Sequence, residues 1–485
     1  MSDRRVIWFR NDLRVHDHAA LAAACAAGDP VLPLYIFEPE AWARPHASSR
    51  QWDFVMACLT DLDAELWRRG ARLHLAIGSA TAVLTRLHAE LGLRAVHAHQ
   101  VFGSAWDQAR DRTVRAWSQR AGVPFLEHAE CGETWSDAAC SARVRAPTRL
   151  QGPPVPGAPW PDAERFDLAG EPCRARLPGG RRPAVERLNA AAEDASVTPD
   201  DALAVLEADL AYGALSLREV CQAIGGRRGE SPCEAARLDA MTQRLRARWR
   251  TLQRVNDMPA IEKRDADPAC DGLRDHPEAD DPKLRAWIEG RTGFPIVDAS
   301  LRAVSAAGIL SAPKRALVIS CAANLLWMHW KRPADALASR LLGIEPAVFY
   351  VQAAAAAREA SDPVVEAETL DPDGAFVRKW LPELAGLSVD EARAPWRVDR
   401  KRLSAAGVTL GATYPAPIVD PADALRFACQ RIDAARRGEG RKRSNAVVRE
   451  KHGARRIPVA KGRRKAAPAA APASQLSLDL PDRPS

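Results

Sequence analysis

The sequence lacks the cysteine and histidine spacings that metal centres need. Its ten cysteines are scattered without a Cys-x-x-Cys pair, and its histidines show no paired spacing of that kind. This pattern argues against zinc and iron–sulfur sites, so we expect no bound metal. Unpaired thiols in such a chain are typical of reduced core residues, and they favour a cytoplasmic protein.

The sequence also lacks an apolar run long enough to cross a bilayer. The longest run, residues 316–330, contains Asn324 and His329 and is shorter than the roughly 20 residues that a spanning helix needs. The N-terminus carries early charges and has no apolar segment of the signal-peptide kind. We therefore expect a soluble protein with no membrane partner.

Most of the chain lacks a net positive charge, although the formal net charge of the whole is +7. Residues 436–465 hold thirteen Lys/Arg and two Asp/Glu, a local charge of +11, which leaves about −4 for the other 455 residues. The body of the chain thus has no net excess of cations for binding phosphates, and the basic character belongs to a tail.

At 485 residues, 47% of them apolar, the chain is too long for one core and predicts two domains and a tail. Residues 1–130 alternate strands and helices, which predicts an α/β Rossmann-like domain whose parallel sheet is covered on both faces. The expected strands are residues 6–9, 31–37, 72–77 and 95–98. Residues 131–196, rich in Pro, Gly and Arg, are typical of an interdomain linker. Residues 197–435 predict an all-α domain, and residues 436–485 predict a disordered basic tail.

Four runs of residues resemble the photolyase/cryptochrome family. Residues 287–299 read Trp-Ile-Glu-Gly-Arg-Thr-Gly-Phe-Pro-Ile-Val-Asp-Ala, which resembles the run at that family's flavin-binding centre. Residues 8–17 read Trp-Phe-Arg-Asn-Asp-Leu-Arg-Val-His-Asp, which is similar to the start of its antenna domain. Residues 373–384 and 414–420 match further family runs. The resemblance implies an α/β domain followed by a helical FAD-binding-like domain.

The same resemblance implies that many flavin contacts are missing. A Thr-Ser pair that the family uses for flavin phosphates corresponds here to Leu203 and Ala204, and an Asn and a Met correspond to Ala312 and Ala316. We therefore expect FAD to bind weakly or not at all. The positions that remain as candidates for FAD contact are Trp249, Arg315 and Glu345.

The segment after residue 341 departs furthest from the family. Gly343 stands where the resemblance implies an Asp that pairs with Arg315, Phe349 stands opposite the reactive nitrogen of the ring, and Ala353 replaces the innermost tryptophan of the electron-transfer series. Trp330 and Trp287 hold the middle and outer places of that series. Without the inner tryptophan, these two are better explained as large core residues.

Two further positions concern the substrate and the antenna. Arg246 stands where the family places a Glu that contacts the pyrimidine dimer, and a solvated helix residue is an equally good interpretation of it. The carboxylate that helps to hold a pterin or deazaflavin corresponds to a position near Ser104. We therefore expect an empty groove in the α/β domain rather than an antenna pigment.

The tail offers two candidate binding segments. Its basic clusters predict loose, sequence-independent DNA binding, with a solvated charge run as the alternative. The cations concerned are Arg441, Lys442, Arg443, Arg455, Arg456, Arg463, Arg464 and Lys465. Residues 475–480, Gln-Leu-Ser-Leu-Asp-Leu, resemble the peptide by which bacterial repair proteins dock on the sliding clamp. Gln475, Leu476, Leu478 and Leu480 would make that contact, unless the leucines fold back as a strand.

Three functions remain open from the sequence. The first is a divergent family member that associates with DNA, and with the nucleoid, through its tail and has lost or altered its FAD photochemistry, in a role linked to repair or replication. The second is an active deoxyribodipyrimidine photolyase that repairs pyrimidine dimers with blue light, the one enzymatic activity that the resemblance implies. The third is a cryptochrome-like blue-light photoreceptor.

Overall fold

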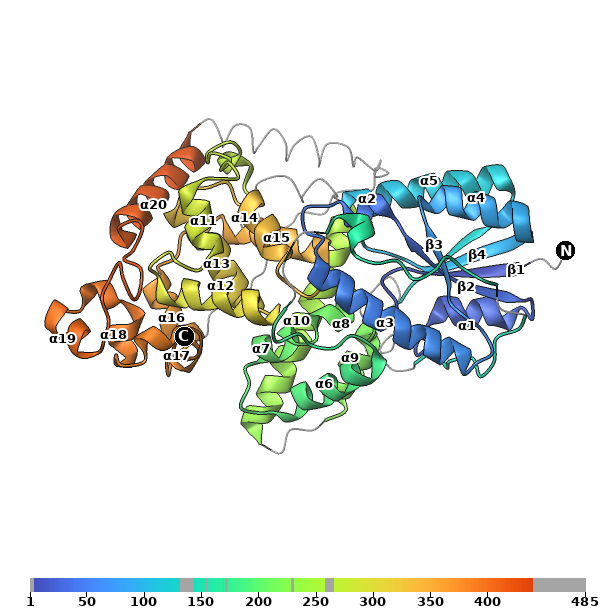
Figure 1. The fold of residues 1–485 in the computed structure, drawn as a ribbon, viewed down its shortest axis with the longest axis horizontal. Helices are drawn as coiled ribbons and strands as arrows, with labels where there is room; N and C mark the ends of the chain where they lie inside the picture. Colours follow the sequence, from blue (N-terminus) through green and yellow to red (C-terminus); the bar gives the residue numbers. More distant parts are fainter. Residues whose placement is uncertain are drawn as a thin grey trace, which may run out of the picture.

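The computed structural model describes residues 4–130, 143–152, 155–168, 170, 173–227, 231–257 and 266–438. Figure 1 shows an α/β part at the right, helices α6–α10 below the middle, and helices α11–α20 towards the left. The predicted α/β domain followed by a helical domain is confirmed. No helix among the described residues is both long and apolar enough to cross a membrane.

The α/β part is built on one five-stranded sheet in which all strands are parallel. The strands are β1 (Arg4–Phe9), β2 (Val31–Phe37), β3 (His74–Ile77), β4 (Leu93–His99) and β5 (Phe125–His128), in the order β3-β2-β1-β4-β5. Central strand β1 pairs with β2 and β4, and Trp8 lies opposite Leu34. The parallel sheet is therefore confirmed, and β5 is a strand that the sequence analysis missed.

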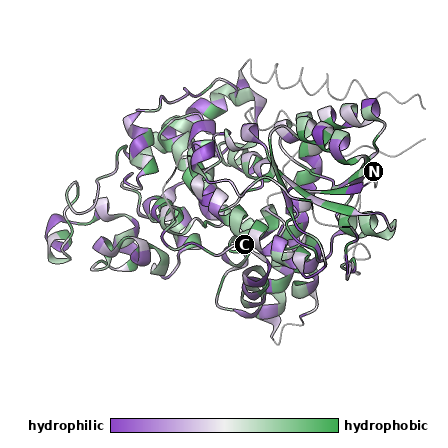
Figure 2. Ribbon diagram, turned by 45° about the vertical axis from the view of Figure 1, so that its right-hand side comes forward, coloured by the Kyte–Doolittle hydropathy of each residue, from purple (hydrophilic) through white to green (hydrophobic). Residues whose placement is uncertain are grey.

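Helices cover both faces of this sheet, because alternate residues of each strand point to opposite sides. Ile7 and Phe9 are buried on the face covered by α1 (Ala19–Ala26) and α3 (Ser49–Trp67). Val6 and Trp8 are buried on the face covered by α4 (Ala80–Leu91) and α5 (Ala105–Ala121). The short helix α2 (Pro39–Trp42) follows β2. Figure 2 shows the strands coloured mostly as hydrophobic, as burial on both faces requires.

The predicted linker, residues 131–196, is more structured than expected. Near Gly157 it runs along the edge strand β3, where the Ala158 N–H donates to the Leu75 carbonyl at 2.7 Å. It then forms helix α6 (Arg181–Glu193), whose Ala184 and Leu188 are buried. The prediction of a linker without a helix was therefore incomplete, because a short apolar stripe is hidden among arginines.

The helical part contains all remaining α-helices of the described chain. They are α7 (Pro199–Ala204), α8 (Glu207–Ala211), α9 (Leu217–Gly225), α10 (Pro232–Asp257), α11 (Pro282–Ile288), α12 (Pro295–Ala307), α13 (Ala312–Ser320), α14 (Lys331–Ala338), α15 (Pro346–Ala356), α16 (Pro363–Leu370), α17 (Ala375–Trp380), α18 (Val389–Arg393), α19 (Arg400–Ala405) and α20 (Pro421–Arg437). A π-helical turn (Cys321–Leu325) follows α13. Arg436 belongs to α20 and donates to Asp267 at 2.9 Å, so the tail begins later than residue 436.

The start of α12 is held by a buried carboxylate. Asp298 is fully buried and accepts hydrogen bonds from the Thr292 N–H and hydroxyl at 2.7 Å, from the Gly293 N–H at 3.0 Å and from the Tyr414 hydroxyl at 2.8 Å. Gly293 has φ +82°, and a Cβ there would lie 2.4 Å from Pro417 N. Burial raises the pKa of Asp298, although these donors oppose the shift. These four hydrogen bonds to Asp298 therefore fix the backbone at the start of α12, and they are called the lock below.

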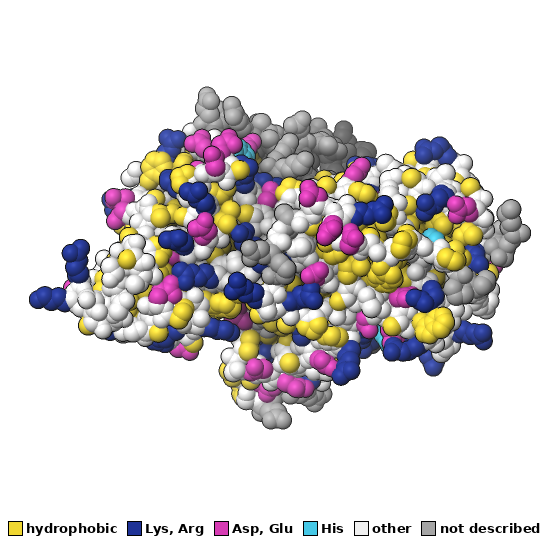
Figure 3. All heavy atoms as spheres, in the orientation of Figure 1, with side chains coloured by type: hydrophobic (Ala, Val, Ile, Leu, Met, Phe, Trp, Pro, Cys, Tyr) yellow, Lys and Arg dark blue, Asp and Glu magenta, His cyan; other side chains and the backbone are white. Residues whose placement is uncertain are grey.

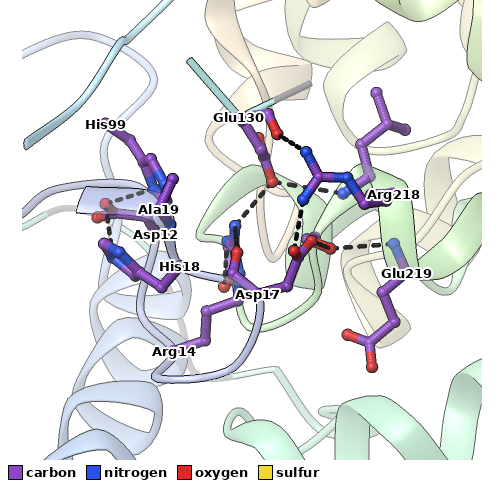
Figure 4. A network of polar contacts seen from close by, with 12 residues as sticks. Asp12, Arg14, Asp17, His18, Ala19, His99, Glu130, Arg218 and Glu219 are labelled. Carbon is purple, nitrogen blue, oxygen red and sulfur yellow. Dashed lines mark hydrogen bonds and ion pairs between the residues drawn. The ribbon is translucent and has the colours of Figure 1, made fainter. Parts of the chain in front are cut away.

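The two parts of the molecule meet through buried polar contacts. On α3, Arg50 donates to the carbonyls of Val304 and Arg340, both at 3.1 Å, and Gln51 donates to that of Ala338 at 3.0 Å. A second set of contacts, drawn in Figure 4, joins Asp17, Arg14 and Glu130 to the start of α9. The α/β part thus forms one wall against which the helical part is packed.

Figure 3 shows one face of the molecule with Lys and Arg side chains gathered near its middle, around α12, among hydrophobic and acidic groups. The described part of the chain therefore presents a mixed surface on this side. Of the eight described cysteines, five are buried and none forms a disulfide.

Candidate functional site

A cavity of about 440 Å³ lies among helices α7, α8, α10, α13 and α15. This volume falls within the roughly 300–1,000 Å³ typical of ligand sites. The lining residues are Asp200, Leu203, Ala204, Glu207, Leu210, Arg244, Leu245, Ala247, Arg248, Arg250, Thr251, Arg254, Ala312, Pro313, Arg315, Ala316, Val348, Val351, Gln352, Ala355 and Ala356. Positions that the sequence comparison picked out in separate stretches, among them Leu203, Ala204, Ala312 and Arg315, therefore meet at one cavity.

Helix α15 presents one face to this cavity. Its lining residues, Val348, Val351, Gln352, Ala355 and Ala356, follow the helical spacing of three and four residues. Phe349 and Ala353 lie on the other side of the helix, buried in the core of the helical part. The structure therefore does not bring these two predicted flavin positions to the cavity.

The neighbours of Gly343 leave no room for a side chain at this position. A Cβ at this position would lie 2.8 Å from Ala208 Cα and 2.9 Å from Tyr212 Cε2, so the Asp that the resemblance implies does not fit without movement of α8. Arg315 finds its carboxylate elsewhere, because its Nη2 donates to Glu207 Oε1 at 3.0 Å and its Nη1 also contacts that carboxylate. Glu207 is thus the partner that the sequence analysis missed.

Two more arginines of the cavity are held by carboxylates. Arg248 lies 2.5 Å from Glu345, the residue that precedes α15. Burial raises the pKa of Glu345, and the Arg248 guanidinium opposes that shift. Arg244 binds Asp200 in a two-pronged contact of 2.6 and 2.7 Å. Arg315 and Arg248 line the cavity, while Glu345 stands behind it as the partner of Arg248.

Trp249, the third predicted FAD contact, is not among the lining residues. It is 1% exposed, and its ring packs edge to face against Phe102 with 5.1 Å between centroids. This contact joins α10 to the loop before α5. Arg246 is half-buried on α10 and is likewise not among the lining residues. The described geometry gives Trp249 a packing role between the two parts of the molecule.

Trp287 and Trp330 are both fully buried, which supports their interpretation as core residues. The Trp287 indole donates to the Val318 carbonyl at 2.9 Å. Trp330 lies 6.5 Å from the ring of Tyr350, whose hydroxyl donates to Asp335 at 2.5 Å. Tyr350 on α15 is an aromatic neighbour of Trp330 that the sequence analysis missed.

A smaller cavity of about 140 Å³ lies at the carboxyl ends of β1 and β2, where the resemblance places an antenna pigment. Arg110 occupies part of its wall, within 3.3 Å of Glu38 and 3.3 Å of Asp107. Its guanidinium also lies 5.2 Å from the ring centre of Trp8. Ser104 is fully buried as the cap of α5 and accepts a hydrogen bond from Arg44 at 2.7 Å. These ion pairs and packed rings leave less space than ligand sites usually offer.

Asp12, His18 and His99 form a buried cluster at the carboxyl end of the sheet (Figure 4). Asp12 Oδ2 lies 3.0 Å from His18 Nε2 and 3.0 Å from His99 Nδ1. The other two ring nitrogens accept backbone N–H groups, from Leu21 at 3.0 Å and Ala19 at 3.1 Å. A neutral imidazole that accepts on one nitrogen carries its proton on the other. The ring protons are therefore on the two nitrogens nearest Asp12, so in this tautomer neither imidazole offers that carboxylate's side a free lone pair.

The contacts of this Asp12 cluster hold the loop after β1 in place. Burial disfavours the charged form of Asp12, but the two imidazoles outweigh it and hold the pKa of that carboxyl well below its usual value. Burial also lowers the pKa of His18 to about 3. The neutral imidazoles and the ionised carboxylate thus fix one arrangement of protons.

The predicted tail sites lie outside the described residues. These are the eight cations named above, which lie in residues 441–465, and the clamp-binding residues Gln475, Leu476, Leu478 and Leu480. Both stay predictions.

Comparisons with known proteins agree with this geometry. Residues 5–132 match the family model for DNA photolyase, and residues 241–434 match the model for the FAD binding domain of DNA photolyase. The chain belongs to the photolyase/cryptochrome family. Much of the lining of the 440 Å³ cavity lies within the second matched segment.

Relatives in this family carry both kinds of name. A deoxyribodipyrimidine photo-lyase of Agrobacterium fabrum is 28% identical over 471 residues, which cover 86% of this chain and 94% of that protein. A cryptochrome DASH of Gloeobacter violaceus is 28% identical over 481 residues, which cover 87% and 94%. The structure of a class III photolyase from Agrobacterium tumefaciens superposes with a TM-score of 0.79 at 24% identity, covering 90% of this chain and 98% of that one. A Synechocystis cryptochrome gives 0.75 at 20% identity, covering 89% and 99%.

Proposed function

We propose that this chain is a DNA-associated photolyase/cryptochrome-like protein whose FAD photochemistry has been lost or altered, with a role linked to DNA repair or replication. One observation carries the proposal. The cavity is lined by Leu203, Ala204, Ala312 and Ala316, at positions where the resemblance implies flavin contacts, and these side chains offer no hydrogen bond to a cofactor.

The charged groups of the cavity also fit FAD poorly. Arg244, Arg248 and Arg315 each have a carboxylate partner already, so they have little to offer a pyrophosphate. Among the described lining residues, the one buried side-chain donor without an acceptor is Arg315 Nε. Each lost hydrogen bond to a charged group costs about 1.5–3 kcal/mol. The two hydroxyls missing at Leu203 and Ala204 would weaken FAD binding by roughly two to four orders of magnitude.

The small groove of the α/β part supports the absence of an antenna pigment. Its volume is about 140 Å³, and Arg110 with its carboxylate partners takes up the polar edge. A protein without flavin has no acceptor for harvested light. The two sites are therefore consistent with one another.

The test is the absorption spectrum of the purified full-length chain, followed by denaturation and measurement of released flavin. We expect protein with far less than one flavin per chain, and no spectral change when FAD is added at micromolar concentration. An intact photolyase, purified in the same way, is the control. Release of one flavin per chain would reject the proposal.

DNA association is proposed for the tail because thirteen Lys/Arg face only two Asp/Glu in residues 436–465. Removal of residues 439–485 leaves α20 whole and should abolish most duplex binding. In the full chain, the affinity should fall with salt at about −0.9 in log–log slope per phosphate neutralised. Exchange of two exposed cations of the body, Arg182→Gln and Arg426→Gln, should change little. Full affinity in the truncated chain would place DNA on the folded body instead.

Clamp docking is proposed for residues 475–480. An extended peptide with one amide and leucines at alternate positions can seat in a preformed apolar pocket, and the Ala/Pro-rich residues 466–473 give it reach. A peptide of residues 470–485 should bind purified bacterial sliding clamp with about micromolar affinity. Exchange of Gln475 and Leu480 for Ala should remove the binding. A peptide that binds equally well after that exchange would contradict the assignment.

A second candidate is an active light-driven repair enzyme. It is favoured by the open cavity of about 440 Å³ and by Arg315, which still lines it. Repair of a thymine-dimer oligonucleotide under blue light, at a rate close to that of an intact photolyase, would establish it. The same flavin measurement tests the photoreceptor alternative.

A further inference from the structure

The cavity among α7, α8, α10, α13 and α15 is held open by ion pairs between different helices. Arg244 on α10 binds Asp200 on α7, Arg315 on α13 binds Glu207 on α8, and Arg248 on α10 binds Glu345 at the start of α15. These three ion pairs connect the helices around a space of about 440 Å³, and Arg244, Arg248 and Arg315 are called the strut arginines below. A space of this size among small side chains would lose packing contacts if nothing filled it.

Helices α13 and α15 give the cavity a largely apolar wall. Helix α13 contributes Ala312, Pro313 and Ala316, and the facing side of α15 contributes Val348, Val351 and Ala355. The polar side chain between them, Gln352, already accepts a hydrogen bond from Arg315 at 3.3 Å. A heterocycle with polar edges would leave several of its atoms unpaired here, whereas a hydrocarbon would leave none.

The mouth of the cavity is positively charged. Arg250 and Arg254 lie one turn apart on α10, line the cavity and are exposed. Neither has a carboxylate partner among the residues that the structure describes, in contrast to the three strut arginines. Two guanidinium groups at this spacing suit one carboxylate, which accepts their N–H groups in parallel.

We propose that this cavity binds an amphipathic carboxylate, with its hydrocarbon body between α13 and α15 and its carboxylate at Arg250 and Arg254. The inference rests on the proposed function, because it requires that FAD does not fill the cavity. An alkyl chain and a fused aromatic ring share this chemistry. The alanine-lined interior accepts either, and the two are separated by experiment.

The probes are decanoate and 2-naphthoate, titrated calorimetrically into the purified full-length chain. We expect saturable binding of one ligand per chain for at least one probe. The neutral counterpart 2-naphthylmethanol should bind at least tenfold more weakly than 2-naphthoate if the aromatic probe binds, and decanol should do so relative to decanoate if the alkyl probe binds. Binding of neither carboxylate, or equal binding of the neutral counterpart, would overturn the inference.

Variants locate the site. Arg250→Gln with Arg254→Gln should weaken carboxylate binding at least tenfold, because both cations of the mouth are lost. The matched control, Arg182→Gln with Arg426→Gln, removes the same charge from two side chains that are 89% and 68% exposed, and should leave binding unchanged. Equal effects of the two double variants would overturn the inference, since they would indicate a general charge effect.

A third variant tests the interior. Ala316→Phe should fill the space between α13 and α15 and abolish binding of either probe. Its thermal unfolding midpoint, compared with that of the unchanged chain, reports whether it folds; Ala355→Phe fills the same space from the opposite helix if it does not. Full binding by a folded filled variant would overturn the inference.

The flavin measurement separates this inference from the proposed function. One flavin per purified chain rejects the proposed function. Flavin-free chain that binds neither probe rejects only the inference about the carboxylate.

Discussion

The start of α12 and the cavity beside α13 are close together in the sequence, but the first matches the family run and the second departs from it. At the start of α12, Thr292, Asp298 and Tyr414 form a lock in which the buried carboxylate accepts four hydrogen bonds. At the cavity, Ala312 and Ala316 stand where the family places polar or larger groups. The groups that fix the backbone are present, whereas Ala312 and Ala316 carry no side-chain hydrogen-bonding group.

Positions that matter for folding can therefore be kept while positions that matter only for a ligand change. The lock satisfies backbone N–H groups inside the protein, so its loss would be felt in folding whatever the protein does. The cavity positions matter only to a ligand, so their loss leaves the fold intact. Family membership and the weak FAD binding that we propose are therefore compatible.

The largest expected effect is on the lock. Asp298→Ala would leave the Thr292 and Gly293 N–H groups and the Tyr414 hydroxyl buried without their acceptor, and should lower the free energy of unfolding by about 3–5 kcal/mol. Urea denaturation of the purified chain measures this. The control is Ser300→Ala, also buried on α12, where only a bond to the Ile296 carbonyl is lost and about 1 kcal/mol is expected. Similar losses in both variants would show that the lock has no special weight.

The cavity offers the reverse experiment. Leu203→Thr with Ala204→Ser restores two hydroxyls on α7, where the resemblance places flavin phosphate contacts. We expect FAD affinity to rise at least tenfold, because each recovered bond to a charged group contributes about 1.5–3 kcal/mol. Calorimetric titration with FAD measures the change, and unfolding by urea should shift by less than about 1 kcal/mol.

The matched control for this gain keeps the side chains apolar. Leu203→Val with Ala204→Val changes the shape at the same two positions without adding a donor, and should not raise FAD affinity. If the hydroxyl variant also gained nothing, the lost phosphate donors would not be what separates this cavity from a flavin site.

The sheet and the helical part could be predicted because their signals are local. Short apolar runs and helical periods lie within a few residues of one another, and the family runs fix their order. Strand β5 (Phe125–His128) was missed because it is an edge strand whose residues are half-exposed or exposed, so no apolar run marks it. Helix α6 was missed because its apolar stripe is short and surrounded by charges.

The chemistry of the cavity could be predicted only in part. Which polar groups are absent can be found position by position, as at Leu203 and Ala204. The groups that replace them cannot, because Glu207 pairs with Arg315 from 108 residues away and on a different helix. Gly343 shows the same limit: its lack of a side chain is explained by the approach of Ala208, which no local pattern reveals.

The Asp12 cluster in the α/β part gives the smallest expected effect near neutral pH and a distinct dependence of stability on pH. Burial lowers the pKa of His18 in the folded chain to about 3, whereas an unfolded histidine titrates near 6.5. The unfolded state therefore takes up the proton first as the pH falls. The stability that neutral His18 contributes is complete above pH 6.5 and is lost progressively between pH 6.5 and 3. His18→Asn keeps an acceptor for the Leu21 N–H and cannot titrate.

We expect this variant to differ from the unchanged chain by less than about 1 kcal/mol at pH 7.5, since the cap of α1 is kept. Well below pH 6.5, its free energy of unfolding should fall less steeply, by up to about 1.4 kcal/mol per pH unit, the value for one proton. Urea denaturation at half-unit intervals from pH 7.5 to 5.0 measures both slopes. If the free energy of unfolding fell equally steeply with pH in both chains, His18 would not be a buried neutral imidazole in the folded protein. The arrangement of protons inferred for the Asp12 cluster would then be wrong. Only the lock at Asp298 would then remain for comparison with the cavity.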